Sequence, residues 1–419
     1  MTRKLVLSIL FPHFLAVGFV IFFPGRAVSE DYLFLSLSSV VFVALVLALG
    51  FLTYSYMRPH KINVSSINEW PVDRTWVNVN SWVLLVVSLL GASFLFYDRV
   101  FVRSINYLDQ ELRAARYEWV ASEGGGFFSV AGNLLIPFSY IGVFFSLRYF
   151  RYIQIRYLLI AVSVVSIFCH AYLNGGRSNI FLLLVFLYVL YCVSDYKVRF
   201  NFLFSKFFIP AVIFCIFASY YVFAVVKSSA SIGDVTIQEL LYLGILEMYG
   251  VPDASFFTEA HADIICFLLY SFLYLFHGQW TSQAVYGLVE YDGYHSIVSA
   301  PTVVLDRLGL IDLGLNERAF ADTGAFVSLP ASIYYDFGWL GLIIGAAFFG
   351  LLFGLVLYYV NTYRRLGFLG SGLVFFTMPI LILSPILPAY GFSYYSFVLF
   401  SMLVFFIANM ALCGRKVYL

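Results

Sequence analysis

The sequence is poor in charge: Asp, Glu, Lys and Arg make up 11% of its 419 residues, whereas soluble domains carry about 25%. Hydrophobic residues make up 62% and aromatic residues 20%. Water could not solvate such a chain, so a soluble enzyme and a disordered protein are excluded. The net charge of +1 gives no overall basic attraction for nucleic acid, which is therefore not expected as a partner. The composition predicts an all-α polytopic membrane protein.

Cysteine is also scarce, and its spacing excludes two further classes. Each of the five cysteines stands alone in an apolar run, and no CxxC or Cys/His metal spacing occurs. Isolated cysteines in such runs are typically small hydrophobic residues of a helix. We therefore expect no disulfide framework and no Cys/His metal site.

Long apolar runs, by contrast, are plentiful. A bilayer core of about 30 Å requires roughly 20 apolar residues in a helix. Ten segments qualify as spans: 5–23, 33–54, 77–97, 129–147, 157–173, 179–193, 207–226, 337–360, 368–387 and 393–412. The first is too long for the apolar region of a signal peptide and lacks a cleavage pattern, so we interpret it as an uncleaved span.

The orientation follows from the Lys and Arg residues of the short connections. With both termini in the cytoplasm, 15 of the 24 Lys and Arg residues lie inside and 20 of the 23 acidic residues lie outside. The near-neutral chain is therefore polarised, with a basic cytoplasmic side and an acidic outer side.

Three regions follow from this topology. Residues 1–226 form an N-terminal membrane region with seven spans, 227–336 a large outer loop with short helices, and 337–419 a C-terminal membrane region with three spans. The apolar run 264–276 is shorter than a span, which is typical of a re-entrant or interfacial helix. If it crossed the membrane, the later basic loops would face outward, so we keep it on the outer side.

Arg177 is the first candidate for chemistry. It lies in the turn Asn174-Gly175-Gly176-Arg177-Ser178, between the spans 157–173 and 179–193. A charge at that depth is a functional-site hypothesis, because membrane-buried charges are costly. Its planar guanidinium suits phosphate, and we expect the neighbouring glycine N–H groups to be free to face an anion. Pairing with an outer acidic residue is the alternative for any of the outer arginines.

Two further groups of polar residues lie on the predicted outer side. Arg307, Arg318 and Asp336 belong to a dense stretch that ends where the span 337–360 begins. Asp336 is either a reacting carboxylate or an N-terminal cap of the following helix. In the first outer loop, Arg113 and Arg116 lie one turn apart on one face of a helix predicted over 109–119.

The GGRS turn, the long outer loop and the stretch Thr323-Gly324 followed by Tyr335–Gly341 resemble the O-antigen polymerases, often called Wzy. Chain length, aromatic content and span number match along essentially the whole chain. The resemblance implies a metal-independent, GT-C-like glycosyltransferase without other cofactors. It also implies a place in the bacterial inner membrane, with the loop 227–336 and the active site facing the periplasm. Such enzymes transfer a glycan from undecaprenyl pyrophosphate to a hydroxyl of a fresh lipid-linked repeat unit. A chain-length regulator protein is a possible further partner.

The reaction places requirements on these residues. The pyrophosphate leaving group requires cations, for which Arg177, Arg307 and Arg318 are candidates and Arg113 and Arg116 come second. The acceptor hydroxyl requires a general base, for which His295, His277 or Asp336 qualifies. His170, one turn before the glycines, is expected to line the same pocket. Tyrosines of the outer loop suit sugar stacking or an interfacial belt: Tyr286, Tyr291, Tyr294, Tyr334 and Tyr335.

Three alternatives stay open. A metal-dependent GT-C transferase would use an acidic pair on the outer side directly after the first span, where Glu30 and Asp31 lie. An O-antigen ligase would share the chemistry and differ in its acceptor. A flippase for lipid-linked oligosaccharides, or another transporter, would require charges along a pathway inside the spans, of which the sequence shows almost none. The absence of an internal repeat also counts against a transporter.

Overall fold

The structure is a computed structural model of the chain. It describes residues 2–22, 30–57, 73–107, 112–121, 126–176, 178–193, 219–220, 222–231, 233–249, 262–276, 327–362, 368–389 and 393–413. All of these residues lie in helices or in the short segments beside them, and none belongs to a strand. The prediction of an all-α chain is confirmed for this part of the protein.

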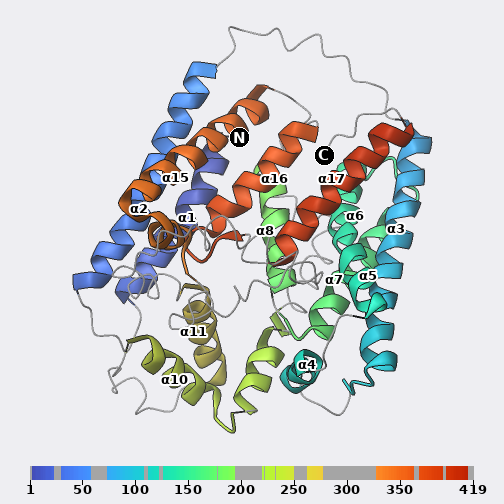
Figure 1. Ribbon diagram of the computed structural model, residues 1–419, viewed down its shortest axis with the longest axis horizontal. Coiled ribbons are helices and arrows are strands. Elements are labelled where there is room, and N and C mark those ends of the chain that lie inside the picture. Colours follow the sequence, from blue (N-terminus) through green and yellow to red (C-terminus); the bar gives the residue numbers. More distant parts are fainter. Residues whose placement is uncertain are drawn as a thin grey trace. The chain divides into compact units, whose positions relative to one another are not determined.

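Helices occupy the predicted spans wherever the chain is described (Figure 1). The helices are α1 (Thr2–Phe22), α2 (Glu30–Met57), α3 (Arg74–Tyr97), η2 (Asp98–Val102), α4 (Leu112–Ala121), α5 (Phe127–Leu135), α6 (Pro137–Arg148), α7 (Arg156–Leu173), α8 (Ser178–Val193), α10 (Ile237–Tyr249), α11 (Asp263–Phe276), α15 (Leu329–Thr362), α16 (Phe368–Leu383) and α17 (Ser393–Cys413). Of the predicted span 207–226, only the last residues are described, and a helix covers Val222–Ser231.

Six helical segments are long and apolar enough to cross a membrane, judged by length and composition among the described residues. They are Ser39–Met57, Arg74–Val102, Phe127–Arg148, Arg156–Leu173, Leu329–Thr362 and Tyr394–Ala411. Shorter apolar helices, including Ser178–Val193 and Gly370–Leu383, lie at other predicted spans. The chain therefore has the helices of a multi-pass membrane protein.

The chain divides into two compact units by its packing. One unit comprises Met1–Trp70 with Leu241–Leu419, and the other comprises Pro71–Leu240. The regions 1–226, 227–336 and 337–419 divide the chain by membrane topology instead, and that division stays a prediction.

In the unit Pro71–Leu240, α3 packs against α5, α6 and α7, and α8 packs against α7. Glycines bring α3 and α5 close together. A Cβ added to Gly91 would lie 2.8 Å from the Ile136 nitrogen, and one added to Gly132 would lie 2.9 Å from the Leu95 nitrogen. Because Ser129, Gly132 and Asn133 share one face of α5, this approach directs polar side chains of α5 toward α3.

In the other unit, the main contact joins α2 to α15. Small residues line it from both sides: a Cβ on Gly350 would lie 2.8 Å from Cβ of Leu49, and one on Gly354 would lie 2.5 Å from Cβ of Thr53 and 2.8 Å from the Gly50 carbonyl oxygen. Glycines allow helices in a membrane to approach until their backbones touch, so van der Waals packing and close main-chain contact hold this pair.

Helix α15 is broken at Gly338, whose φ of 63° and ψ of −158° are not helical. A Cβ added to Gly345 would lie 2.9 Å from Cδ1 of Ile333, although twelve residues of straight helix span about 18 Å. The segment 329–337 therefore folds back along the longer arm that follows Gly338. Glycine adopts this positive φ without the clash that a Cβ would introduce.

The start of this short arm is tied to two other segments of the same unit. The Leu329 N–H donates to the Ser384 carbonyl oxygen over 2.8 Å, and Oγ of Ser384 lies 3.0 Å from Nε2 of His13 in α1. His13 and Ser384 are both buried. Hydrogen bonds between helices satisfy polar groups that hydrocarbon would leave without partners.

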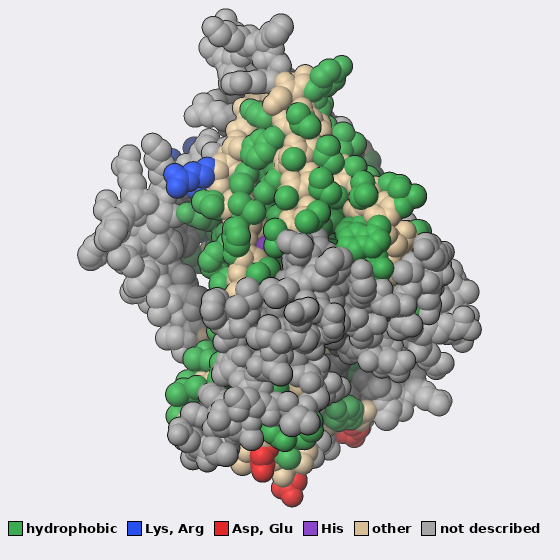
Figure 2. All heavy atoms as spheres, turned by 90° about the vertical axis from the view of Figure 1, so that its left-hand side faces the viewer, with side chains coloured by type: hydrophobic (Ala, Val, Ile, Leu, Met, Phe, Trp, Pro, Cys, Tyr) green, Lys and Arg blue, Asp and Glu red, His purple; other side chains and the backbone are tan. Residues whose placement is uncertain are grey.

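The surface that carries α2 and α15 is apolar (Figure 2). Exposed side chains there include Val41 and Leu52 of α2 and Leu340, Ile343 and Phe348 of α15. A continuous apolar surface of this kind, on helices of membrane-spanning length, is suited to contact with lipid.

Candidate functional site

A buried ion cluster forms where α3 ends. The helix passes into the π-turn η2, in which the Arg103 N–H donates to the Asp98 carbonyl oxygen over 2.9 Å. Arg99 and Arg103 both reach Oδ2 of the Asp98 carboxylate, Arg99 through Nη1 and Arg103 through Nε at 2.9 Å. Single π-turns within α-helices occur frequently at functional sites. Here the turn is followed by Ser104, whose φ is 54°.

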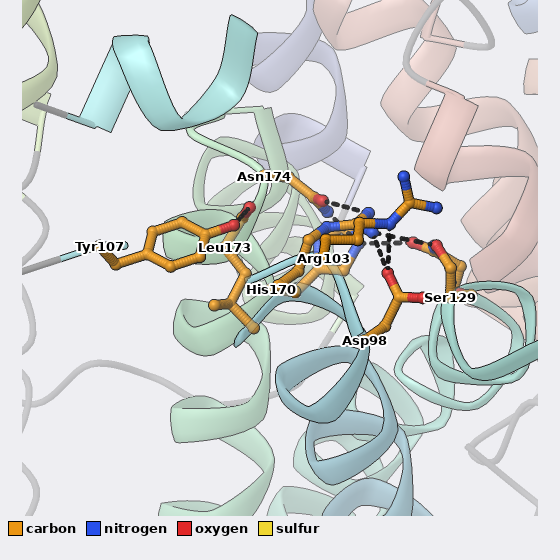
Figure 3. Close-up of polar contacts among 9 residues, drawn as sticks. Asp98, Arg103, Tyr107, Ser129, His170, Leu173 and Asn174 are labelled. Atoms are coloured by element: carbon orange, nitrogen blue, oxygen red, sulfur yellow. Dashed lines mark hydrogen bonds and ion pairs between the residues drawn. The ribbon is translucent and has the colours of Figure 1, made fainter. Parts of the chain in front are cut away.

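Arg99 is the centre of this cluster, and its side chain is fully buried. Besides Asp98, its guanidinium donates to Oγ of Ser129 over 3.2 Å and to Oδ1 of Asn174 over 3.3 Å. The ring of Trp119 lies 4.3 Å from the guanidinium carbon, a cation–π contact that connects α4 to the cluster. Figure 3 shows Asp98, Ser129 and Asn174 close together, with the polar contacts of the cluster as dashed lines.

His170, in the last turn of α7, lies in a second cluster beside the first. Its Nε2 is 3.0 Å from Oδ1 of Asn133 and 2.8 Å from Nδ2 of Asn174, and Asn179 approaches its Nδ1. The side chain is 3% exposed. Three amides thus surround the imidazole, and no carboxylate is among these partners. Through Asn174 and Asn133, His170 connects the turn before Arg177 to α5. The prediction that His170 contacts substrate stays a prediction.

The turn that leads to Arg177 is ordered by its own backbone. The Gly176 N–H donates to the Ala171 carbonyl oxygen and the Gly175 N–H to that of Tyr172, both over 3.0 Å. With φ of 57° at Gly175, these bonds form a Schellman motif that ends α7. The prediction that these N–H groups face an anion is wrong, because both are used to terminate the helix.

Tyr107, in the segment that follows η2, also forms hydrogen bonds to the turn before Arg177. Its hydroxyl donates to the Leu173 carbonyl oxygen over 2.7 Å, and the Tyr172 hydroxyl donates to the Tyr107 carbonyl oxygen over 3.1 Å. Burial raises the pKa of Tyr107 to about 12, so the hydroxyl keeps its proton at neutral pH and remains a donor. The turn is therefore held by Arg99 and by Tyr107 as well as by its backbone.

An apolar hollow of about 550 Å³ lies next to the ion cluster on the same helices. Its lining includes Phe94, Tyr97, Phe101, Phe128 and Cys169, so α3, η2, α5 and α7 all contribute. Tyr97 precedes Asp98 directly in the sequence. An apolar surface and a set of buried ions thus meet at one end of this unit.

Several predicted site residues lie outside the described residues: Arg177, His277, Tyr286, Tyr291, Tyr294, His295, Arg307 and Arg318. Arg113 and Arg116 lie in α4, so the predicted helix in the first outer loop is confirmed with shifted bounds. Glu30 and Asp31 are the first two residues of α2. For these α4 and α2 residues the structure gives the backbone position only.

Asp336, Tyr334 and Tyr335 lie in the short arm of α15. The Asp336 side chain is 0% exposed, two residues before the break at Gly338. Tyr335 packs with Val327 and Ala331 in an apolar cluster. The Tyr334 ring contacts that of Trp339 across the break, with centroids 5.3 Å apart. Asp336 is therefore a buried carboxylate at an interrupted helix, which is the position at which membrane proteins commonly build sites.

Reasoning from the sequence missed Asp98, Arg99 and Arg103 as site residues. The sequence does mark them: Asp98 and Arg99 follow directly after an apolar run, and Arg103 comes four residues after Arg99. Charged side chains at such a position are costly. Asn133, Asn174 and Asn179 were also missed, although amides at helix ends in a membrane typically bond across helices. The structure brings together these residues: Asp98, Arg99, Arg103, Tyr107, Trp119, Ser129, Asn133, His170, Asn174 and Asn179.

The arrangement holds cations and amides in fixed positions at one end of a helical unit. The Arg99 guanidinium donates through Nη1 and Nη2 to Asp98, Ser129 and Asn174, which fixes its orientation, whereas its Nε and Oδ1 of Asp98 have no hydrogen-bond partner within the part of the chain that the structure describes. Among the described residues, no three His, Cys, Asp or Glu side chains are grouped to hold a metal ion. Comparison with protein families, with curated proteins and with solved structures gives no match to this chain.

Proposed function

We propose that the chain is a glycosyltransferase that polymerises undecaprenyl-pyrophosphate-linked oligosaccharide repeat units into O-antigen or a similar surface polysaccharide. The observation that carries this proposal is the buried cluster of Asp98, Arg99 and Arg103, which is bonded through Asn174 to the turn that leads to Arg177. Transfer of a glycan from a pyrophosphate requires cations that bind the leaving group more tightly as its charge develops. Arg177, which follows this hydrogen-bonded turn, supplies one such cation.

In this proposal the acceptor hydroxyl attacks the anomeric carbon of the donor glycan. The bond between that carbon and the pyrophosphate oxygen breaks, and the lipid pyrophosphate leaves with the bonding electrons. Arg177, Arg307 and Arg318 bind the pyrophosphate, with Arg113 and Arg116 as further phosphate ligands. His295 or Asp336 takes the hydroxyl proton, Tyr334 and Tyr335 contribute to the sugar site, and His170 lines the pocket beside the turn that leads to Arg177. The step requires no metal ion or other cofactor.

The proposal also places the protein in the cell. About ten helices in a GT-C-like arrangement cross the bacterial inner membrane, both termini lie in the cytoplasm, and the active site faces the periplasm. On this topology the polar cluster at the ends of α3 and α7 lies at the outer end of both spans. Donor and acceptor repeat units, the bilayer and a chain-length regulator are the expected partners.

Another GT-C-type transferase is the nearest alternative. An O-antigen ligase would bind the same donor, and a metal-dependent enzyme would use Glu30 and Asp31 at the start of α2. Both alternatives share the requirement for cations at the pyrophosphate. They differ from the polymerase in the acceptor or in the response to chelators.

One observation favours a transporter of lipid-linked oligosaccharides as a second candidate. The buried Asp336 beside the break at Gly338 has the form of a discontinuous transporter helix with an ionisable side chain at the interruption. A transporter would move repeat units between leaflets and would leave their length unchanged. The location and length of the accumulated units therefore distinguish the two candidates.

Deletion of the gene tests the proposed function in cells. Loss of a polymerase should leave single repeat units on the carrier at the periplasmic leaflet, with surface glycans of one unit, because export precedes polymerisation. Gel analysis of surface glycans and leaflet-specific labelling of the carrier-linked units provide the measurement. Polymer of normal length would contradict the proposal, and units confined to the cytoplasmic leaflet would support the transporter instead.

A further inference from the structure

Asn174 bridges the two polar clusters of the unit Pro71–Leu240. Its Oδ1 accepts a hydrogen bond from Nη2 of Arg99 over 3.3 Å, so its amide is oriented with Nδ2 toward His170. Nδ2 lies 2.8 Å from Nε2 of His170. One side chain at the C-terminal end of α7 thus connects the buried ions of α3 to the imidazole of α7.

The orientation of this amide limits what His170 can do. Asn133 donates through Nδ2 to the Ser129 carbonyl oxygen over 2.8 Å, so its Oδ1 faces Nε2 of His170 at 3.0 Å. Nε2 therefore meets an acceptor on Asn133 and a donor on Asn174, and a neutral imidazole serves one of them at a time. The Asn179 amide nitrogen faces Nδ1, so the donors of Asn174 and Asn179 favour opposite tautomers of the ring.

Asn174 also lies two residues before the glycine that precedes Arg177. Its own N–H donates to the His170 carbonyl oxygen over 3.1 Å, and the Schellman bonds of Gly175 and Gly176 follow directly. The side-chain bond to Arg99 therefore fixes the turn relative to α3, which the backbone bonds within α7 cannot do. Removal of this bond leaves the turn intact as a turn while releasing it from the ion cluster.

We propose that Asn174 is a positioning residue that transmits the placement of the buried Arg99 to the turn that presents Arg177. The role in catalysis rests on the proposed function, whereas the role in fixing the turn does not. Asn174 touches neither donor nor acceptor in this account. It acts through the position of Arg177, and small displacements of a catalytic group cost about 100-fold in rate.

Gly176→Cys supplies a reporter for the position of the turn. Apart from its chain neighbours, the nearest described heavy atom to a Cβ added at Gly176 would be Oγ of Ser178, at 4.0 Å, so a cysteine side chain fits there. The rate at which a membrane-impermeant maleimide labels this cysteine is measured in the parent background and with Asn174→Ala. Because labelling requires no turnover, the labelling rate can be measured even if the protein catalyses no polymerisation.

Asn174→Ala is expected to change the labelling rate of the Gly176→Cys reporter by about 5-fold or more, and to lower kcat at least about 10-fold with KM within about twofold of the parent. Asn174→Asp keeps the oxygen that accepts from Arg99 and loses the donor toward His170. It is expected to restore the parental labelling rate, which a general loss of packing would not do.

Asn80→Ala is the matched control. Asn80 is also a buried asparagine of the same unit, and its Nδ2 donates to the Trp76 carbonyl oxygen over 2.9 Å at the other end of α3. Labelling of the reporter should be unchanged in this variant. A parental labelling rate in Asn174→Ala would overturn the proposal. An altered labelling rate in a protein without polymerase activity would uphold the positioning of the turn and refute the proposed function.

Discussion

Replacing Arg99 with alanine is expected to lower the free energy of unfolding by about 3–5 kcal/mol and to abolish polymer formation. The substitution removes the guanidinium closest to the fully buried Asp98 carboxylate and deprives Ser129 and Asn174 of a donor. Breaking a buried pair by removal of one partner is costly because a charge remains in a low-dielectric environment. Thermal unfolding of the purified protein in detergent, alongside the glycan ladder in cells, provides the measurement.

Arg156→Ala is the matched control for this prediction. The Arg156 guanidinium lies over the rings of Phe150 and Tyr157, at 4.9 Å and 5.3 Å, at the start of α7. Such a partly exposed cation–π contact is worth about 0.5–1 kcal/mol. Arg99→Lys should fall between the two, because an ammonium supplies a charge without the planar fork. Equal unfolding temperatures for Arg99→Ala and Arg156→Ala would refute the structural role of the ion cluster.

Gly354→Ala is expected to destabilise the unit that contains α2 and α15 by about 1–3 kcal/mol, despite the better helix propensity of alanine. The new methyl group would lie 2.5 Å from Cβ of Thr53 and 2.8 Å from the Gly50 carbonyl oxygen. Neither contact is the far end of a flexible side chain, so the two helices must separate. A lower unfolding temperature in detergent is the expected measurement.

Gly372→Ala in α16 separates crowding from helix propensity. A Cβ at Gly372 meets no heavy atom within 4 Å, so the same substitution there gains propensity without a clash. It is expected to leave the unfolding temperature unchanged or to raise it. If Gly354→Ala behaved like Gly372→Ala, the close approach of α2 and α15 would not hold in solution.

Apolar runs predicted the helices well because a membrane requires both length and low charge of each span. The helices α3, α7 and α8 begin and end close to the predicted residues. The short arm of α15 was predicted only as part of a loop that contains short helices. Its reversal occurs at Gly338 and places Ile333 beside Gly345, a tertiary arrangement that hydropathy does not encode.

The candidate site was predicted in part. The sequence singled out Arg177 and His170, and the structure ties the turn before Arg177 to His170 through Asn174. The ion cluster was missed because Asp98 and Arg99 were assigned to a loop, whereas the π-turn continues the helix and buries them. The glycine N–H groups were assigned to an anion because the sequence does not show that a Schellman motif uses them.

Polymerisation by the purified protein tests the central proposal most directly. The protein is reconstituted in vesicles with undecaprenyl-pyrophosphate-linked repeat units and EDTA, and the products are separated by length. The account predicts a ladder of extended glycans with the parent chain and unextended units with Arg177→Ala. Unextended units with a folded parent protein would contradict it, and a ladder that EDTA abolishes would favour the metal-dependent transferase.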